Sequence, residues 1–309
     1  MQETINWEEL RRKKTEEYGT KYKNWSWILV RQYKDRTHFL FELLQNAEDA
    51  GASQVTLLLD RNAFAVEHDG TLFTKRDVVS ITDVESTKGG AGSIGKFGIG
   101  FKSVYAYTTK PRIYSGKYSF EIRDFLFPHE ISPIPLGAGL TRIEIPFNRH
   151  RNDTGSGQNV TPEQLRKLRE TAFAEIKQAL LRQINETSLL FLNRIQTLEI
   201  QIQDGDTVHM TREVRDLDGA KGSIIRYKRT AHGHTDLTQE FSYWVFADQR
   251  VQTAVAFLHR GNEVVPVSNP PVFTFFPTDK ESHQSFFKLH LRQRPHVTIS
   301  WRTAKGTGN

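Results

Sequence analysis

The sequence contains no cysteine among its 309 residues. That absence excludes disulfide bonds, thiolate metal sites and cysteine nucleophiles, and it is typical of a cytoplasmic protein. No run of eighteen apolar residues occurs, so we expect no membrane span. The first residues lack the basic and apolar segments of a secretory signal peptide, so we expect none.

Acidic residues are missing from the last part of the chain. Residues 283–309 carry five Lys and Arg side chains and no Asp or Glu, and the whole chain has a formal net charge of +6. A basic excess of this size is compatible with nucleic-acid binding but does not require it. The simpler interpretation is a solvated basic tail.

The length of the chain predicts two domains. Residues 149–158 are polar and glycine-containing, and they are the best candidate for a linker. We therefore expect one domain over residues 1–150 and a second region over residues 160–309. The second region should begin with a long helix, capped by Thr161 and continuing to Ile184.

Hydrophobic periodicity and turn residues predict the elements of both parts. Helices are expected at residues 7–18, 35–50, 75–82, 98–107 and 161–184. Strands are expected at residues 55–59, 63–67, 111–115, 117–123, 140–146, 195–203, 222–229, 240–247 and 251–258. This order predicts an α+β fold, in which helices cover one face of a mixed, mainly antiparallel sheet, followed by a β-rich α+β region.

Three polar side chains form one stripe on an otherwise apolar helix. Glu42, Asn46 and Asp49 are spaced at i, i+4 and i+7, so they project from the same face. Most other positions of residues 39–50 are apolar, as in a helix that packs on a sheet. Two carboxylates and an amide aligned in this way are suited to hold a metal ion and a water.

A glycine-rich segment follows about fifty residues later. Gly95, Gly98 and Gly100 let the backbone approach a ligand closely and direct its amides towards that ligand. The helix expected to begin near Gly98 adds its positive end, which favours phosphate. Phe97 and Phe101 are expected to anchor the segment in the core. Together with the polar stripe, this segment predicts a nucleotide site.

Two common phosphate-binding motifs match the same segment, but neither fits its context. Residues 90–95 (GAGSIG) spell the dinucleotide fingerprint, which must directly follow a strand and open the helix of a βαβ unit. Residues 90–96 nearly spell a P-loop, but Phe97 stands where Ser or Thr must bind magnesium. We keep both as minor alternatives.

Four segments resemble, in the same order, the motifs of the GHKL ATPases. This family includes gyrase, the ninety-kilodalton heat-shock chaperones, histidine kinases and mismatch-repair ATPases. The matching segments are residues 42–50 (ELLQNAEDA, N-box), 67–74 (EHDGTLFT, G1 box), 95–101 (GKFGIGF, G2 box) and 140–145 (LTRIEI, last strand). The resemblance implies a Bergerat-type two-layer α/β sandwich over residues 1–150 and a transducer or partner-binding region after it. That region is short, as in a truncated protein or a short family member.

Three shorter sequence segments look most like those of the sacsin-type branch of this family. They are residues 86–88 (STK), 101–105 (FKSVY) and 275–278 (FFPT).

The resemblance implies a role for each matching residue. Glu42 is the expected general base, Asn46 the magnesium ligand, and Asp49 a second polar group in the same pocket. The phosphates are expected to contact the backbone amides of Gly95, Gly98 and Gly100. The lid over ATP is expected to contain Ser86, Thr87 and Lys88. The remaining expected nucleotide contacts are Gly70, Phe101 and Thr141, the last of them near the base.

The G1 box departs from the family pattern D-x-G-x-G, whose first Asp bonds the adenine amino group. When Phe73 and Thr74 are used as the anchor, that position falls on His68, and the second glycine becomes Leu72. We expect Asp69 to take the role from one residue along. The alternative is that this chain holds the base differently.

In members of this family, the following domain often supplies a cation that stabilises the transition state. Arg302 is the candidate by position, and the alternative is an ordinary basic tail residue. Lys96 and Lys102 are further candidates, and the alternative for both is a solvent-facing lysine.

The resemblance implies a magnesium-dependent ATP-binding protein with slow ATPase activity. Closure of the lid over ATP would then change the pose of the second domain. The implied partners are an unidentified protein client and a second copy in a nucleotide-dependent dimer, in a chaperone-like, defence or DNA-processing setting. A non-hydrolysing nucleotide-sensing or scaffolding module and a nucleic-acid-acting ATPase remain alternatives. A histidine kinase is disfavoured, because no dimerisation helix pair with a phospho-acceptor histidine precedes residue 42.

Overall fold

The computed structural model describes residues 4–19, 36–83, 100–149, 161–217, 220–231, 234–248, 253–267, 272–273, 277–278 and 290–292. By contact, the chain divides into two compact units. Unit 1 consists of Met1–Arg212 and Ile225–Glu240, and unit 2 consists of Glu213–Ile224 and Phe241–Asn309. The predicted linker at 149–158 lies almost entirely outside the described residues, and the boundary placed there stays a prediction.

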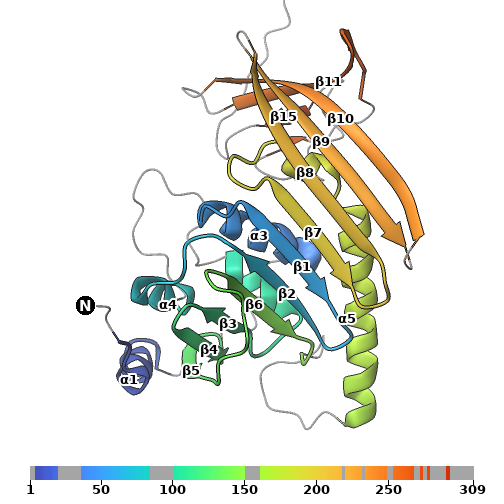
Figure 1. The fold of residues 1–309 in the computed structure, drawn as a ribbon. Helices are drawn as coiled ribbons and strands as arrows, with labels where there is room; N and C mark the ends of the chain where they lie inside the picture. The colour runs from blue at the N-terminus through green and yellow to red at the C-terminus, as the bar shows by residue number, and fades with distance from the viewer. Residues whose placement is uncertain are drawn as a thin grey trace, which may run out of the picture. The chain divides into compact units, whose positions relative to one another are not determined.

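The sheet of unit 1 is mixed but mainly antiparallel. Its strands follow the order β9-β8-β7-β1-β2-β6-β3-β4-β5 (Figure 1). Part of β8 and part of β9 belong to unit 2. Their bounds are β1 Gln54–Leu59, β2 Ala63–His68, β3 Arg112–Ser115, β4 Tyr118–Arg123, β5 Phe127–Glu130, β6 Thr141–Pro146, β7 Thr197–Ile202, β8 Thr207–Leu217 and β9 Ala220–Ala231. Strands β1 and β7 pair in parallel, and β1 pairs antiparallel with β2, as the sequence predicts for residues 55–67.

Four α-helices and three 3-10 helices are described in unit 1. They are α1 Trp7–Tyr18, η1 Arg36–His38, α3 Phe39–Asp49, α4 Lys75–Ile81, η2 Gly100–Ala106, α5 Pro162–Arg182 and η3 Glu186–Leu189. Helix α5 begins where the sequence predicts, because Thr161 and Gln164 form a capping box and Pro162 occupies the first turn. None of the helices in the described residues is long and apolar enough to cross a membrane.

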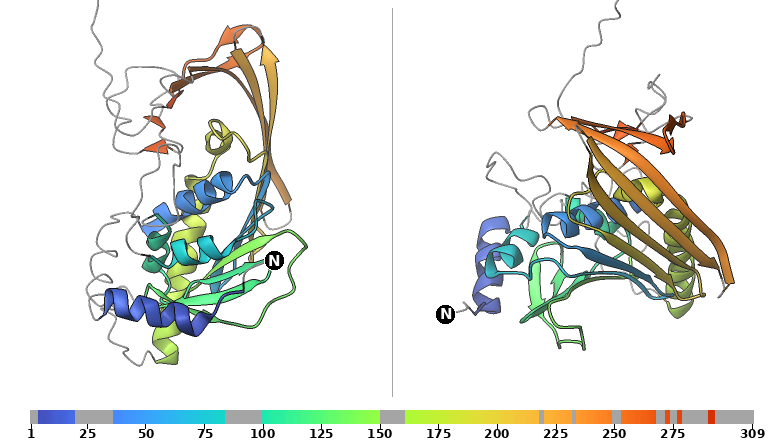
Figure 2. Two further views of the ribbon diagram at one scale, coloured as in Figure 1. Left: turned by 90° about the vertical axis from the view of Figure 1, so that its left-hand side faces the viewer. Right: turned by 45° about the horizontal axis from the view of Figure 1, so that its top comes forward.

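The described helices that contact the sheet pack on the same face of it (Figure 2). Phe39 of α3 meets Phe64 of β2 with ring centroids 5.4 Å apart. Trp7 of α1 meets Phe120 of β4 at 5.5 Å. Pairing across β2, β6, β3 and β4 shows that Phe64 and Phe120 share one face. This confirms the predicted α+β architecture with helices on one side of the sheet.

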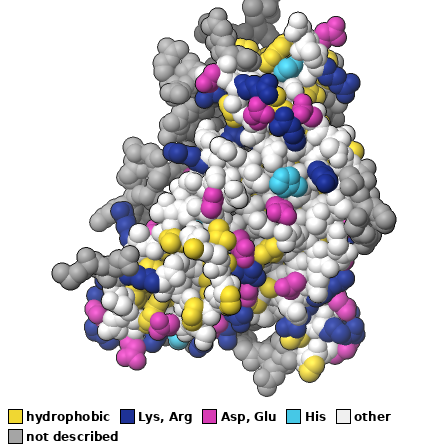
Figure 3. Space-filling view, viewed as in Figure 1, with side chains coloured by type: hydrophobic (Ala, Val, Ile, Leu, Met, Phe, Trp, Pro, Cys, Tyr) yellow, Lys and Arg dark blue, Asp and Glu magenta, His cyan; other side chains and the backbone are white. Residues whose placement is uncertain are grey.

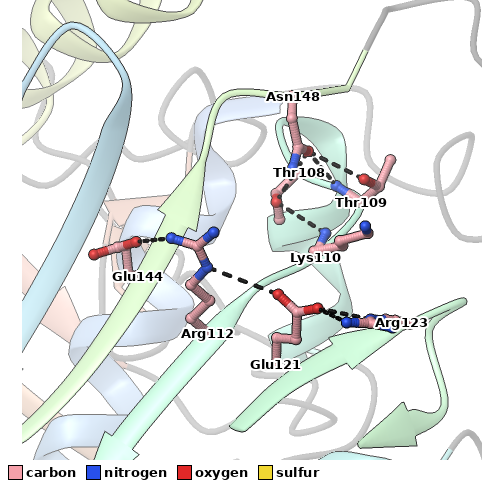
Figure 4. Close-up of polar contacts among 8 residues, drawn as sticks. All are labelled: Thr108, Thr109, Lys110, Arg112, Glu121, Arg123, Glu144 and Asn148. Atoms are coloured by element: carbon pink, nitrogen blue, oxygen red, sulfur yellow. Dashed lines mark hydrogen bonds and ion pairs between the residues drawn. The ribbon is translucent and has the colours of Figure 1, made fainter. Parts of the chain in front are cut away.

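The opposite face of the sheet carries a ladder of alternating charges. Arg142 on β6 pairs with Glu67 on β2 at 2.7 Å, and Arg112 on β3 pairs with Glu144 on β6 at 3.0 Å. Figure 4 shows Arg112 between Glu144 and Glu121, with Glu121 also bonded to Arg123. Each charge therefore has a neighbour of opposite sign. Figure 3 likewise shows acidic and basic side chains interspersed on the face in view.

Asn148 fixes the chain just after η2. Its Oδ1 accepts hydrogen bonds from the Thr109 backbone N at 2.7 Å and from the hydroxyls of Thr108 and Thr109 (Figure 4). The turn after η2 is thereby tied to the end of β6, where Asn148 lies two residues beyond Pro146.

Unit 2 contains β11 to β15, β10 from Phe241 onward, and the adjoining ends of β8 and β9. The bounds are β10 His234–Asp248, β11 Thr253–Arg260, β12 Glu263–Val264, β13 Val272–Phe273, β14 Pro277–Thr278 and β15 His290–Arg292. Strand β11 pairs antiparallel with β10, β12 and β15. Trp244 on β10 stacks on His259 of β11 with ring centroids 4.3 Å apart.

One predicted helix differs in type from the observed one, and two observed strands were not predicted. The helix expected at residues 98–107 is a 3-10 helix over Gly100–Ala106, where glycine, β-branched and aromatic residues disfavour an α-helix. Strand β5 was not predicted, because Pro128 and two titratable residues weaken its pattern, and it lies at the end of the strand order. Strand β8 was also missed, because its charged residues interrupt the apolar alternation.

Candidate functional site

Helix α3 carries the predicted polar stripe above the core of unit 1. Leu40 and Leu43 are at most 1% exposed, so their side of the helix packs on the sheet. Asn46 is only 5% exposed, whereas Glu42 is partly exposed and Asp49 is exposed. The stripe therefore follows the border between the core and the surface.

One end of the Asn46 amide has no protein partner within the described chain. Its Nδ2 atom is buried and lacks a hydrogen bond there. Buried polar atoms without partners are rare in folded proteins, so a site of this kind is suited to a ligand. A half-turn of the amide places its oxygen at the same point, which then offers a hard ligand for a cation.

The carboxyl group of Asp49 has an unusual proton affinity. Although its side chain reaches the surface, desolvation by the surrounding chain, together with the nearby Glu48 carboxylate, raises the pKa of Asp49 to about 7. Asp49 is therefore partly protonated near neutral pH. A protonated carboxyl group donates a hydrogen bond, which an anionic ligand accepts.

Glu42 lies against the first residue of η2. A Cβ atom built on Gly100 would come within 2.0 Å of Glu42 Oε2, so only glycine leaves room for this carboxylate. The other oxygen, Oε1, accepts a hydrogen bond from His38 Nε2 at 3.1 Å. The helix of residues 42–50 and Gly100 thus meet at Glu42, and the predicted contact of Gly100 with phosphate stays a prediction.

The opposite end of α3 meets the G1 segment. The Thr71 backbone N donates to the Ala50 carbonyl at 2.8 Å, and a Cβ atom on Gly70 would come within 2.9 Å of the same oxygen. The two glycine-containing segments therefore contact α3 at its two ends. Gly70 is needed for close packing here, and its predicted contact with nucleotide stays a prediction.

His68 ends β2 on the face that carries the helices. It is 4% exposed, and its Nδ1 accepts a hydrogen bond from the Gly70 backbone N at 3.2 Å. Burial lowers the pKa of His68 to about 4, and the Asp69 carboxylate opposes this only in part. His68 is therefore neutral at physiological pH.

Thr141 and Ser115 continue the row that His68 begins. His68 pairs with Thr141 across β2 and β6, and Thr141 pairs with Ser115 across β6 and β3. The two hydroxyl oxygens are 2.6 Å apart, and Ser115 Oγ also accepts from the Phe73 backbone N at 2.9 Å. Thr141 is fully buried, and Ser115 is 1% exposed. The predicted role of Thr141 near the base stays a prediction. Sequence reasoning missed Ser115, whose only signal was its place beside the Gly116 turn.

Asp69 uses its carboxylate to organise the start of β1. Oδ1 accepts from the backbone N atoms of Ser53 and Gln54 at 2.8 and 2.9 Å, and Oδ2 accepts from Ser53 Oγ at 2.5 Å. Desolvation acts to raise the pKa of Asp69, but these hydrogen bonds outweigh it and lower the pKa. The predicted contact between Asp69 and the base stays a prediction.

Residues 101 and 102 both lie in the core. Phe101 is 1% exposed, in agreement with its expected role as an anchor. The alternative of a solvent-facing Lys102 is wrong, because this side chain is 2% exposed. Its Nζ donates to the carbonyls of Ile81 and Phe125, each at 2.9 Å. Burial lowers the pKa of Lys102 to about 7, and the nearby Lys14 adds to this effect.

Glu48, next to the polar stripe, connects α3 to a distant segment. Its carboxylate accepts hydrogen bonds from the backbone N atoms of Asn193, Arg194 and Ile195 at 2.6 to 3.1 Å. The side chain is 8% exposed. Residues 193–195 lead into β7, so Glu48 fixes the helix of the site to the strand beside β1. The sequence offered no signal for this contact.

Several predicted residues lie outside the described part of the chain. They are Ser86, Thr87, Lys88, Gly95, Lys96, Phe97, Gly98 and Arg302. Their roles stay predictions. Within the described residues, no group of three or more His, Asp and Glu side chains forms a metal site by itself. A metal ion held at Asn46 would therefore need further ligands, such as phosphate oxygens and water.

Comparison with known proteins finds relatives over part of the chain. Protein NO VEIN from Arabidopsis thaliana is 28% identical over 197 residues, covering 59% of this chain and 7% of that protein. Sacsin from Homo sapiens is 34% identical over 107 residues, covering 28% of this chain and 2% of that protein. The chain thus spans only a small fraction of the length of these relatives. No family model matches the chain.

Among solved structures, the N-terminal domain of a DNA repair protein aligns over 86% of both chains at 11% identity. Its TM-score of 0.44 is too low to support a conclusion. The sequence relatives are more informative, because their identities of 28% and 34% extend over 197 and 107 residues. This chain is therefore similar over part of its length to sacsin and to Protein NO VEIN, in line with the resemblance of its motifs to the sacsin-type branch of the GHKL ATPases.

Proposed function

We propose that unit 1 binds ATP with Mg²⁺ along helix α3 and hydrolyses it slowly. The observation that carries the proposal is the meeting of Glu42 and Asn46 on one helix face with Gly100 packed directly against the Glu42 carboxylate. Glycine at this point brings backbone amides close to an acidic side chain, which suits a phosphate group and the water that attacks it.

The length of α3 between Glu42 and Ala50 supports a nucleotide that lies along the helix. Glu42 and Gly100 mark one end, and Ala50 with Gly70 marks the other. Eight residues of α-helix separate Glu42 from Ala50, which corresponds to about 12 Å. A nucleotide with an extended phosphate chain matches this span. The phosphates would lie towards Glu42, and the base towards the buried row of His68 and Thr141.

Glu42 would act as the general base. Its Oε1 is held by His38, and its Oε2 faces Gly100. His38 is a positioning residue in this proposal, because its hydrogen bond fixes the carboxylate while the other oxygen orients the attacking water. His38 stands four residues before Glu42, and this i, i+4 spacing was the signal that sequence reasoning overlooked.

Asn46 fits the role of a magnesium ligand. Its amide is buried, and one end of it has no hydrogen-bond partner within the described chain. When bound, Mg²⁺ would neutralise charge on the phosphates. Asn46 supplies an oxygen at a fixed position, and Asp49 supplies a second polar group one turn further along the helix.

The proposal is tested by the effect of Asn46→Ala on ATP binding, measured by calorimetry with Mg²⁺ and with EDTA. We expect the wild type to bind ATP more tightly with Mg²⁺ than with EDTA. In the variant, this gain in affinity for ATP should be smaller by about tenfold or more. Gln45→Ala removes an amide from the adjacent position and serves as the matched control. Absence of ATP binding by the wild type would contradict the proposal.

Gly100→Ala should slow turnover while leaving the fold intact. The new methyl group would overlap the Glu42 carboxylate, whose flexible end can move away, so the free energy of unfolding should change by less than about 1 kcal/mol. Displacement of the base should reduce phosphate release at least about tenfold. The double variant with Glu42→Gln should be no slower than Glu42→Gln alone, because both changes act through one carboxylate. Additive losses would show that Gly100 acts in another way.

We further propose that binding acts as a conformational switch. The Glu48 carboxylate transmits any movement of α3 to residues 193–195 and so to the start of β7. This contact supports a path from the nucleotide to the rest of the chain. A protein client, a nucleotide-dependent dimer and a chaperone-like or DNA-processing role remain proposals. ATP binding without phosphate release would favour a nucleotide-sensing module.

A further inference from the structure

The row formed by His68, Thr141 and Ser115 is a buried polar surface at the base end of the proposed site. The three residues are direct neighbours across β2, β6 and β3. None is more than 4% exposed. Gly70, whose backbone N donates to His68, packs against Ala50 at the end of α3, so the row begins beside that end of the site helix.

The proton of His68 is placed by the backbone. A backbone N–H always donates, so Nδ1, which accepts from the Gly70 N, carries no hydrogen. The neutral ring must then carry its hydrogen on Nε2. Nε2 has no hydrogen-bond partner among the described residues. The imidazole consequently offers the site a donor and has no unused acceptor.

The two hydroxyl groups add one more donor. Only one hydrogen can lie between Ser115 Oγ and Thr141 Oγ1, which are 2.6 Å apart. The other hydroxyl hydrogen remains available, whichever of the two groups holds it. Neither group is anionic, and the nearest carboxylate in sequence, Asp69, is engaged with Ser53 and Gln54. His68 Nε2–H is therefore the group of the row that can only donate, whereas the hydroxyls can both donate and accept.

We propose that this row selects a base by donating hydrogen bonds, so that 6-oxopurine nucleotides bind at least as tightly as ATP. The inference rests on the proposed nucleotide site and specifies its substrate class. An oxygen at C6 of guanine or hypoxanthine accepts from His68 Nε2, whereas the C6 amino group of adenine is itself a donor. A donor facing a donor leaves both groups without partners, which disfavours binding.

The experiment compares Mg²⁺ complexes of ATP, GTP and ITP by calorimetry on the full chain. We expect the dissociation constants of GTP and ITP to be equal to or lower than that of ATP. His68→Asp places an acceptor in the row and should shift the ATP-to-GTP preference towards ATP by about tenfold or more. His68→Asn, whose amide both donates and accepts, should give an intermediate preference. His259→Asn, in unit 2, is the matched control.

Each outcome separates this inference from the proposed function. If no nucleotide binds, the proposed function fails. If the wild type binds ATP more tightly than both GTP and ITP, the function stands and the inference is overturned. If His68→Asp does not fold, as judged by its melting curve, the wild-type comparison and His68→Asn decide the question. An unchanged preference in folded His68→Asp would also overturn the inference.

Discussion

Glu42→Gln should reduce phosphate release from ATP by at least about 100-fold while leaving the dissociation constant of ATP within about threefold. The amide keeps the shape of the side chain beside Gly100 but cannot take a proton from water. Turnover should therefore fall far more than binding. The measurement is single-turnover phosphate release with binding determined on the same samples.

The control for this experiment is Glu170→Gln, which neutralises an exposed carboxylate bonded to Arg166 on α5. It should leave both quantities unchanged. Glu42→Ala should resemble Glu42→Gln in turnover. Hydrolysis that persists at the wild-type rate in both Glu42 variants would remove Glu42 from the mechanism and favour another base.

Glu48→Ala should destabilise unit 1 more than any other single change proposed for this chain. Three backbone N–H groups, from Asn193, Arg194 and Ile195, would lose a charged acceptor. Hydrogen bonds to charged groups contribute about 1.5–3 kcal/mol each, so we expect a loss of about 3–5 kcal/mol in the free energy of unfolding after partial rescue by water. Denaturant unfolding followed by circular dichroism measures it.

Two further variants test whether the loss of stability comes from the Glu48 carboxylate. Glu48→Gln keeps one oxygen acceptor and should lose about half as much stability. Glu170→Ala removes an exposed carboxylate of the same kind and should change the free energy of unfolding by less than about 0.5 kcal/mol. A Glu48→Ala protein as stable as the Glu170→Ala protein would show that residues 193–195 are held by other contacts.

The sequence predicted the parts of the fold that depend on local pattern. The stripe of Glu42 and Asn46 follows from helical spacing, and the start of α5 follows from the capping residues at Thr161 and Gln164. The antiparallel pair β1–β2 follows from two β-rich segments joined by a short polar turn. These signals act within a few residues, so a single sequence contains them in full.

The parts that were missed depend on contacts between distant residues. Ser115 meets Thr141 only because β3 and β6 pair in one register. Glu48 meets Asn193 across 145 positions of sequence. The sequence offered Lys102 as a candidate for the transition-state cation or as a solvent-facing lysine, but tertiary packing buries it against two carbonyl groups. No periodicity in the sequence encodes such partners.

The parallel pairing of β1 with β7 has a consequence for any attempt to divide this protein. A fragment ending near residue 150 would contain the whole polar stripe but not Thr197–Ile202, so β1 would become an unprotected edge strand. Its exposed N–H and C=O groups would be available to pair with other chains, and fragments of this kind tend to aggregate. The smallest piece expected to remain soluble and monomeric therefore extends past β7, well beyond the last motif of the nucleotide site.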